Sequence, residues 1–338
     1  MSKKDLGLLV LILVVAAGVY IRNPLFLSPN NIANTANLIG LFGLFSIAQG
    51  FVIITGGIDL SSGSMIALLG VLFVDLVGNR GVPWPLALVI VLILGILLGL
   101  AHALLITRLK MPAFVVTLCG LLIYRGVARG YTGDATAGFP FGSVYPGLDF
   151  FTARPYGIPT SLLLLVVVAV IAWVVLHRSV FGRYLFAVGK NEEAARFSGI
   201  RTNLVVGAAY VICAGLTALS AVFFAMYTRS VSPSSQANFY ELYAIAAAVL
   251  GGFSLRGGEG SIIGVVLGAI LLQILQNLVN LLGIPSSLNF AVMGTVILIG
   301  VMVDQQFGVY RAHRRLVEAA RDTADDSRPT VTRNAEMP

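Results

Sequence analysis

Charged side chains are scarce in this sequence. Only 11% of its 338 residues are Asp, Glu, Lys or Arg, whereas 57% are hydrophobic. A water-soluble domain carries about 25% charged residues and about 45–50% apolar residues. The mean hydropathy of +0.92 points the same way. Because too little polar surface is present to coat a soluble globule, we expect an integral membrane protein.

Cysteine and histidine are also rare, which excludes several kinds of site. The two cysteines, Cys119 and Cys213, both lie in apolar runs, so neither a disulfide framework nor a cysteine metal site can be built. No Gly-x-Ser-x-Gly elbow surrounds SSGS at 61–64, so His102 has no serine nucleophile to activate. We expect no covalent chemistry and no bound metal or cofactor.

Sequence signals for an energy source within the chain are missing as well. The only Gly-Lys pair, at 189–190, is followed by Asn191, and Tyr184 stands where a phosphate-binding loop needs glycine. The candidate ion-coupling groups are Asp59, Asp75 and His102. Of these, Asp75 and His102 fall near predicted span ends, where solvation is favoured. Nucleotide energy would have to come from a partner. An ion-coupled secondary carrier remains the weaker alternative.

Long apolar runs, in contrast, are abundant. A helix needs roughly 17–25 apolar residues to cross the hydrocarbon layer. The sequence therefore predicts an all-α polytopic membrane protein with ten spans. These are Leu6–Ile21, Ile32–Ile54, Ser64–Val77, Pro85–Thr107, Met111–Tyr131, Ile158–Leu176, Leu204–Tyr227, Asn238–Leu255, Ile262–Leu282 and Leu288–Val303.

The distribution of basic residues predicts the orientation. With the amino terminus inside, most of the 22 Lys and Arg residues lie on the inner side, as cytoplasmic loops require. Both termini are therefore predicted to be cytoplasmic. The net charge of +7 is assigned to orientation and not to nucleic-acid binding. We expect a transmembrane domain over 1–310 and a polar, disordered tail over 311–338. A cleaved signal peptide behind Lys3-Lys4 is the alternative for the first span.

A polar loop over 177–203 interrupts the apolar runs. Asn191 is a good N-cap, and Glu192 and Glu193 fall in the first turn, where acidic side chains favour the helix dipole. Gly199 supplies a stop. A short capped helix of this kind can bind in a groove on a soluble subunit. An ordinary solvated loop helix is the alternative interpretation.

Two stripes of amide side chains are candidates for a substrate pathway. Uncharged polar substrates such as sugars need amides and hydroxyls more than buried charge. One stripe repeats at i, i+3, i+4 and i+7 in the ninth span, and a weaker one follows the second span. Substrate contact and hydrogen bonding between helices remain alternatives for both. The residues are Gln273, Gln276, Asn277 and Asn280, and Asn34, Asn37 and Gln49.

Glycine pairs predict two breaks in the helical pattern. Gly56-Gly57 precede Asp59, which can cap a helix beginning near Ser61, as a structural cap or gate or as a direct ligand of the substrate. Gly251-Gly252, with GGEG at 257–260, form a similar break on the same side. Gly-x-x-x-Gly at 95–99 and 264–268 permits close helix packing, inside the chain or in a dimer.

The loop sequence EAARFSG at 193–199 resembles the Glu-Ala-Ala-x-x-x-Gly signature by which ATP-binding cassette importer permeases contact their ATPases. Glu193, Ala194, Ala195 and Gly199 carry the match, although the usual downstream Ile-x-Leu-Pro is missing. Five ordered blocks between about residue 25 and Asp304 resemble the ribose/xylose/arabinose-type sugar permeases. They are GGIDLSSGS (56–64), PAFVVTLCGLLIYRGVARGYT (112–132), HRSVFGRYLFAVGKNEEAARFSGI (177–200), ELYAIAAAVLGGFSLRGGEGSIIGVVLGAIL (241–271) and QNLVNLLGI (276–284).

This resemblance implies a function and a set of partners. An external sugar-binding protein would deliver a monosaccharide, ribose-like or a related hexose, to a permease dimer in the bacterial cytoplasmic membrane. A cytoplasmic ATPase would use ATP and Mg²⁺, and the second permease subunit would be identical or different. Ser62, Lys190 and Tyr243 depart from the usual Val, Gly and Asp, and Tyr243 leaves the sugar open. The related branched-chain amino-acid type of permease is the main alternative.

Overall fold

The computed structural model describes residues 3–140, 142, 145–285, 288, 290–292, 294–295, 298 and 302. Residues 1–293 form one compact unit. Half of the residues of the predicted tenth span, Leu288–Val303, lie outside the described residues, so the span itself is not described. The predicted tail over 311–338 lies wholly outside them.

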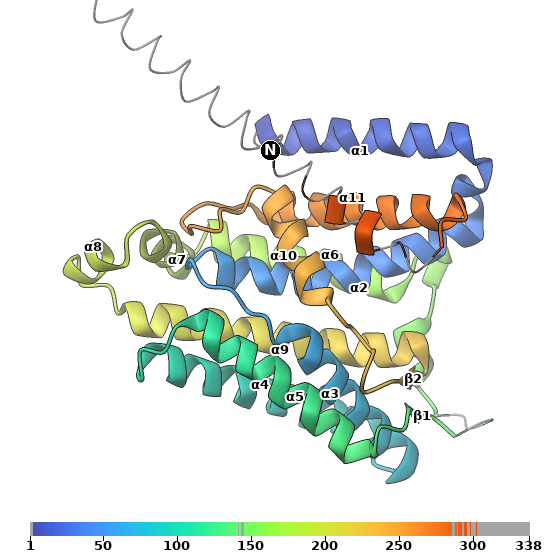
Figure 1. The fold of residues 1–338 in the computed structure, drawn as a ribbon, viewed down its shortest axis with the longest axis horizontal. Helices are drawn as coiled ribbons and strands as arrows, with labels where there is room; N and C mark the ends of the chain where they lie inside the picture. The colour runs from blue at the N-terminus through green and yellow to red at the C-terminus, as the bar shows by residue number, and fades with distance from the viewer. Residues whose placement is uncertain are drawn as a thin grey trace, which may run out of the picture. The chain divides into compact units, whose positions relative to one another are not determined.

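Helices account for nearly all of the unit (Figure 1). Among the described residues, eight helices are long and apolar enough to cross a membrane. They are α1 (Lys3–Arg22), α2 (Pro29–Ile53), α3 (Ser62–Val74) with its π-helical extension η2 (Asp75–Asn79), α4 (Trp84–Thr107), α5 (Ala113–Thr132), α6 (Thr160–His177), α9 (Thr202–Thr228) and α11 (Ile262–Leu281). This chain is therefore an all-α polytopic membrane protein.

Shorter elements connect these helices. The short helices α7 (Val180–Lys190) and α8 (Glu192–Phe197) precede α9, and α10 (Tyr240–Leu250) follows it. The strands β1 (Ala137–Gly138) and β2 (Ser230–Val231) pair antiparallel, with Ala137 opposite Val231. Three 3₁₀ turns complete the unit: η1 (Pro24–Leu27), η3 (Leu148–Thr152) and η4 (Pro155–Gly157).

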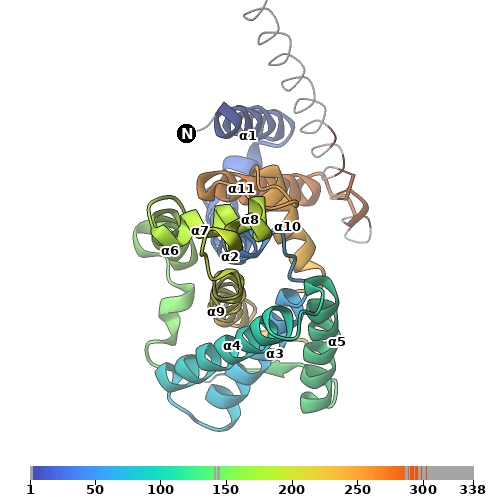
Figure 2. The ribbon, with the colours of Figure 1, turned by 90° about the vertical axis from the view of Figure 1, so that its left-hand side faces the viewer.

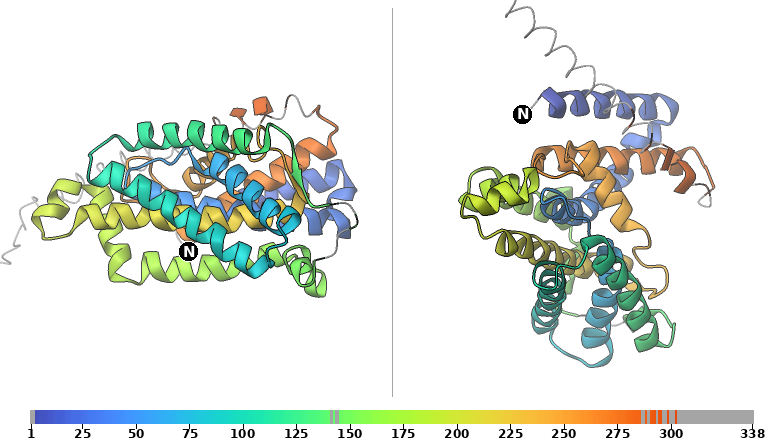
Figure 3. Two further views of the ribbon diagram at one scale, coloured as in Figure 1. Left: turned by 90° about the horizontal axis from the view of Figure 1, so that it is seen from below. Right: turned by 60° about the vertical axis from the view of Figure 1, so that its left-hand side comes forward.

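Two helices, α2 and α9, form the centre of the unit. α2 contacts α6, α9, α10 and α11, while α9 contacts α2, α3 and α4. The most apolar window of α2 is 78% buried, against 17% for α1. α1 lies at the margin, where it packs on α11 (Figures 2 and 3). The remaining surface of α1 is therefore available to lipid.

Small residues set how closely these helices pack. A Cβ atom on Gly95 would lie 2.5 Å from the Cβ of Ala218, and one on Gly99 would lie 2.7 Å from that of Ala214. α4 therefore packs tightly on α9. A Cβ atom on Gly268 would lie 2.1 Å from the carbonyl oxygen of Ala247 in α10. Both Gly-x-x-x-Gly motifs thus pack inside the chain.

Two predicted segments differ from the structure. The span predicted over Asn238–Leu255 is wrong in length, because α10 has only 11 residues, or about 16 Å of helix. Its end at Leu250 is a glycine stop: Gly252 has a φ of +92°, and the amide of Phe253 donates back to the carbonyl oxygen of Ala248 at 2.9 Å. The polar loop contains two helices instead of one, since α7 precedes α8.

The two ends of the unit differ in character. α7, α8 and the N-terminal end of α1 lie at one end, which we call the α8 end (Figure 1). The β1–β2 ribbon lies at the other, which we call the ribbon end. The shared position of the chain's start and α8 agrees with the predicted orientation, in which both face the same compartment.

Candidate functional site

The α8 helix is built as the sequence predicts. The Asn191 side chain accepts a hydrogen bond from the amide of Ala194 at 3.0 Å, which satisfies one open donor of the first turn. Arg196 donates to Glu192 at 2.9 Å, and the Thr202 hydroxyl donates to the same carboxylate at 3.1 Å. Gly199, with a φ of +84°, ends the helix. The cap and the stop are confirmed.

The surface of α8 is almost entirely open. Ala195 is its one buried residue, and Glu192, Glu193 and Ala194 are all exposed. Phe197 is 90% exposed, although it lies at the end of a polar helix outside the apolar spans. Phe197 is the one aromatic residue of α8, between Arg196 and Ser198, and sequence reasoning did not single it out. A helix with a single buried residue, with carboxylates and an aromatic ring outside, has the character of a docking surface.

The end of α7 contacts both helix breaks through one glycine. A Cβ atom on Gly189 would lie 1.8 Å from the carbonyl oxygen of Ile54 and 2.4 Å from the amide nitrogen of Gly258. That amide donates to the Ile54 carbonyl at 2.9 Å. Lys190 pairs with Glu259 at 3.0 Å. The backbones of the two breaks and of α7 therefore meet at one point, which we call the glycine junction.

The break after α2 holds a buried polar centre. Asp59, which is 1% exposed, accepts hydrogen bonds from the amide and the hydroxyl of Ser61, at 2.8 and 2.6 Å. Gln49 donates to the Asp59 carbonyl at 2.6 Å and to the Ser62 hydroxyl at 2.8 Å. Asp59 thus supports Ser61, the residue at which α3 is capped, without bonding to α3 itself. Gln49 and Asp59 together hold the turn that precedes α3 through hydrogen bonds.

Further polar groups from α4, α5 and α9 surround Asp59. The Tyr124 hydroxyl lies 2.8 Å from Nε2 of His102, and the Cys213 sulfur lies 3.7 Å from the Asp59 carboxylate. His102 is 2% exposed, so the prediction of a solvated histidine is wrong. Among the described residues, His102 Nδ1 and the Tyr210 hydroxyl have no hydrogen-bond partner. Asp75 instead pairs with Arg80 at 2.7 Å near the surface.

The amide stripe on α11 divides into different environments. Asn277 and Asn31 exchange two hydrogen bonds, at 2.7 and 3.1 Å, so Asn277 joins α11 to the start of α2. Gln273 is buried, Gln276 is partly buried and Asn280 is exposed. Asn31 was not predicted, because it lies just before the apolar part of the second span. For Asn277 the structure favours hydrogen bonding between helices.

The stripe on α2 divides as well. Asn34 accepts a hydrogen bond from Arg154 at 2.9 Å. The Ser161 hydroxyl at the start of α6 donates to Asn37. Gln49 lies further along the helix, in the polar centre. These contacts bring Asn34 and Asn37 to the ribbon end, next to the segment that precedes α6.

An aromatic cluster that the sequence did not indicate lies between α2, α9 and α10. The rings of Phe42 and Tyr240 are 4.6 Å apart, and Phe45 stacks on Tyr240 at 6.2 Å. Phe224 and Tyr243 contact the same group. Phe42, Tyr240 and Tyr243 are only partly buried. The cluster was missed because its members are spread over three helices and look like core residues in the sequence.

A buried charge lies next to this cluster. The Glu241 side chain, 4% exposed, contacts Gly63 at the start of α3, where a Cβ atom would lie 2.1 Å from the carboxylate. Arg125 of α5 donates to the carbonyl oxygens of Pro233 and Gln236, at 3.1 and 2.8 Å. These contacts connect α5 and the loop before α10 to the first turn of α3.

Fold and site together define a class: a multi-pass helical membrane protein with broken helices, a buried polar centre and a projecting helix at one end. Residues 31–301 match the family model described as branched-chain amino acid transport system / permease component. The ribose import permease protein RbsC of Bacillus subtilis is 40% identical over 304 residues, which cover 89% of this chain and 91% of that protein.

Two further relatives are also sugar permeases. The ribose import permease protein RbsC of Escherichia coli is 36% identical, covering 90% of this chain and 94% of the relative. The xylose transport system permease protein XylH of Escherichia coli is 30% identical, covering 82% and 86%. No solved structure matches the chain significantly. The chain belongs to the family of ATP-binding cassette importer permeases that contains these sugar permeases.

Proposed function

We propose that this chain is the membrane subunit of an importer that carries a monosaccharide, a ribose-like pentose or a related hexose, using ATP hydrolysed by a partner. The observation that carries the proposal is α8: a capped helix, buried only at Ala195, that exposes Glu193 and Phe197 at the end of the bundle. A cytoplasmic ATPase, which would bind ATP and Mg²⁺ itself, docks there. The protein would lie in the bacterial cytoplasmic membrane with both termini inside.

The glycine junction would transmit a movement of the docked ATPase to the membrane-spanning helices. Because Gly189 contacts the backbone at Ile54 and at Gly258, a displacement of α7 and α8 pushes on both breaks. One break leads to Asp59 and α3, and the other leads to α11. ATP binding by the partner would thus favour one arrangement of these segments over another, as a population shift.

The substrate would pass among aromatic and amide side chains. Partly buried Phe42, Tyr240 and Tyr243 offer apolar faces, while Gln273 and Gln276 on α11 offer hydrogen bonds, and sites for neutral polar ligands combine both. The names of the relatives, ribose and xylose permeases, support a sugar. An external binding protein would deliver it at the ribbon end to a pair of permease subunits.

The description of the matching family favours a second candidate, a branched-chain amino acid. A zwitterion needs a cationic and an anionic partner. Arg125 is bound to backbone carbonyls and Glu241 lies against α3, so neither charge faces the aromatic cluster as a prepared ligand. The sugar proposal therefore has the stronger support.

Reconstitution into vesicles with the cognate ATPase and binding protein tests the proposal. Hydrolysis of ATP should rise when the binding protein carries its sugar, and the labelled sugar should accumulate. Glu193→Lys should abolish accumulation and ATPase association while the protein inserts normally. Asp149→Lys, an exposed charge reversal far from α8 in the chain, should leave ATPase association intact. Accumulation without the ATPase would contradict the proposal.

A further inference from the structure

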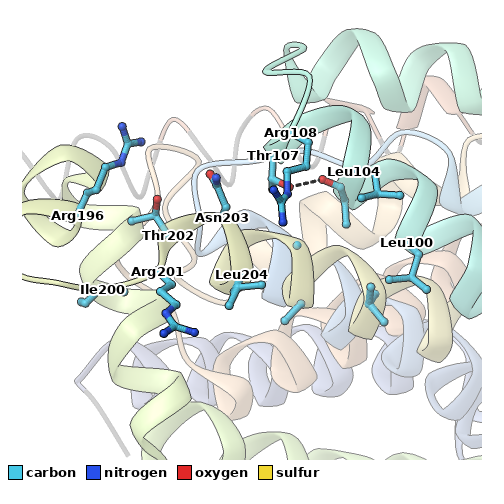
Figure 4. Close-up of a pocket in the computed structure, with 14 residues that line it drawn as sticks. Leu100, Leu104, Thr107, Arg108, Arg196, Ile200, Arg201, Thr202, Asn203 and Leu204 are labelled. Atoms are coloured by element: carbon cyan, nitrogen blue, oxygen red, sulfur yellow. Dashed lines mark hydrogen bonds between the residues drawn. The ribbon is translucent and has the colours of Figure 1, made fainter.

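A groove of about 790 Å³ lies between α4 and α9, beside α8 (Figure 4). Small residues create it. A Cβ atom on Gly207 would lie 3.3 Å from the Cβ of Ala103, so the two helices nearly touch at the floor. Leu104 and Leu204 stand on either side and are 57% and 60% exposed. The groove is therefore narrow, apolar at its floor and open along its length.

The groove runs from a basic mouth into the apolar part of both spans. Arg108 and Arg201 line the mouth, at the ends of α4 and α9 nearest α8 (Figure 4). Leu100 lies eight residues before Arg108, and Val211 lies ten residues after Arg201. At 1.5 Å per residue, the apolar part extends roughly 12–15 Å from the arginines. That depth lies within the hydrocarbon layer.

Positive charge at the mouth has no counterpart in the described part of the chain. No acidic residue lines the groove. Arg196 pairs with Glu192, and Lys110 donates to Asn203 at 2.9 Å. Arg108 and Arg201 make neither an ion pair nor a side-chain hydrogen bond with any described residue. Arg108 and Arg201 thus place exposed positive charge on the two sides of a mouth that is apolar below, with the Arg201 guanidinium directed away from Arg108 (Figure 4).

We infer that this groove binds an anionic phospholipid, with its phosphate at the basic mouth lined by Arg108 and Arg201 and an acyl chain along Leu100, Leu104 and Val211. Guanidinium groups match phosphate geometry with paired hydrogen bonds, and basic pockets between spans suit acidic head groups. A loop of a soluble partner could not enter 12–15 Å of hydrocarbon, because its backbone would lose its hydrogen bonds. Assignment to the inner leaflet rests on the orientation in the proposed function.

The position of the site links the lipid to α8. Arg196 at the end of α8 and Ile200 after it both line the groove. A bound lipid would therefore fill the space between α4 and the segment that joins α8 to α9. Anionic lipid should stabilise this arrangement of α8, and its loss should leave α8 free to shift.

Native mass spectrometry of the full-length chain in mild detergent, titrated with phosphatidylglycerol or with phosphatidylcholine, tests the inference. We expect retention of phosphatidylglycerol in preference. Arg108→Gln with Arg201→Gln should weaken it at least about tenfold, as expected for two charge-assisted hydrogen bonds. Arg183→Gln with Arg256→Gln removes the same charge from exposed positions outside the groove and should leave retention unchanged.

A second variant tests the apolar part alone. Ala208→Leu places a larger side chain in the groove, keeps every charge, and should also weaken phosphatidylglycerol retention, by several-fold. Equal retention by all variants would overturn the site. Loss of ATPase association with unchanged lipid retention would instead assign the groove to the ATPase, and a change of oligomeric mass alone would assign it to a second copy. Since no transport is measured, failure here leaves the proposed function standing.

Discussion

The amide nitrogen of Gly258 donates a hydrogen bond to the carbonyl oxygen of Ile54, 2.9 Å away, and Gly189 packs against both. This contact joins the irregular segment after α2 to the one after α10. The two segments are far apart in the sequence, yet both touch the last turn of α7. The helix pair α7–α8 is consequently attached to the membrane part through backbone atoms. A side chain can relieve a clash by changing rotamer, but at this contact the helix itself would have to move.

Gly189→Ala should therefore disturb the glycine junction. The added Cβ atom would lie 1.8 Å from the Ile54 carbonyl oxygen, so the backbone must move. We expect a loss of about 1–3 kcal/mol in the free energy of unfolding in detergent, together with weaker stimulation of ATP hydrolysis. Gly126→Ala in α5 is the control, because no atom lies within 4 Å and the helix should gain up to about 1 kcal/mol. Equal behaviour of the two variants would contradict the junction.

Asn31 and Asn277 should behave as a coupled pair. Asn277→Leu leaves the Asn31 side-chain oxygen without its donor, although the Asn31 nitrogen still donates to the Phe26 carbonyl, and we expect a cost of about 1–2 kcal/mol. Combining it with Asn31→Leu should cost less than the sum of the two single changes, by at least about 0.5 kcal/mol. Asn280→Leu, at an exposed position of the same helix, serves as the control. Additive costs in thermal unfolding would count against the pair.

Gln276→Leu separates the two interpretations of the α11 stripe. Gln276 is partly buried and makes no side-chain hydrogen bond with a described residue. If it faces the substrate, uptake or selectivity should change while ATPase association and thermal stability stay within about 0.5 kcal/mol of the parent protein. Normal uptake by the folded variant would limit the stripe to packing.

Phe197→Ser should weaken ATPase binding without affecting stability. The ring is 90% exposed, so its removal should change the free energy of unfolding by less than about 0.5 kcal/mol. Burial of an aromatic anchor in a partner typically contributes more than 1 kcal/mol, and we expect at least about a fivefold weaker association. Phe150→Ser, an exposed ring away from α8, is the matched change. Association is measured by titration in detergent, and an unchanged affinity would refute the assignment.

Asp59 should tolerate Asn but not Ala. Asn keeps an oxygen that can accept from the amide and hydroxyl of Ser61, whereas Ala leaves both donors buried and unpaired. We expect Asp59→Ala to lower the free energy of unfolding by about 2 kcal/mol or more, and Asp59→Asn by less than about 1 kcal/mol. Transport by Asp59→Asn then tells whether the charge itself is needed. Similar melting of both variants would show that the turn does not depend on these bonds.

Much of the architecture could be predicted from the sequence, because a helix that crosses the lipid bilayer needs a long apolar run. Apolar length located the spans, and Asn191 and Gly199 fixed the start and stop of α8, since caps act within one turn. The family was recognised from five ordered blocks. Stripe positions such as Gln276 stay predictions, as does the identity of the sugar.

What the sequence could not provide depends on contacts across the chain. His102 looked like a span-end residue, and only packing against Tyr124 and Tyr210 makes it buried. The aromatic cluster needs α2, α9 and α10 side by side. The glycine junction joins three segments through backbone atoms, which leave no pattern beyond glycine itself. α10 was predicted too long because apolar residues continue past the point where Gly251 meets Gly264.

The central position of α2 has a consequence for how the chain assembles. α2 is among the first segments to leave the ribosome, but its neighbours α6, α9 and α11 follow much later. The Asn31 side-chain oxygen must wait for Asn277, 246 residues downstream, before it accepts the hydrogen bond that joins the two helices. During synthesis the helix that ends up most buried therefore stays without its partners until α6 and the helices after it have been made. Insertion machinery must therefore shield the polar residues of α2 from lipid until these partner helices have been inserted.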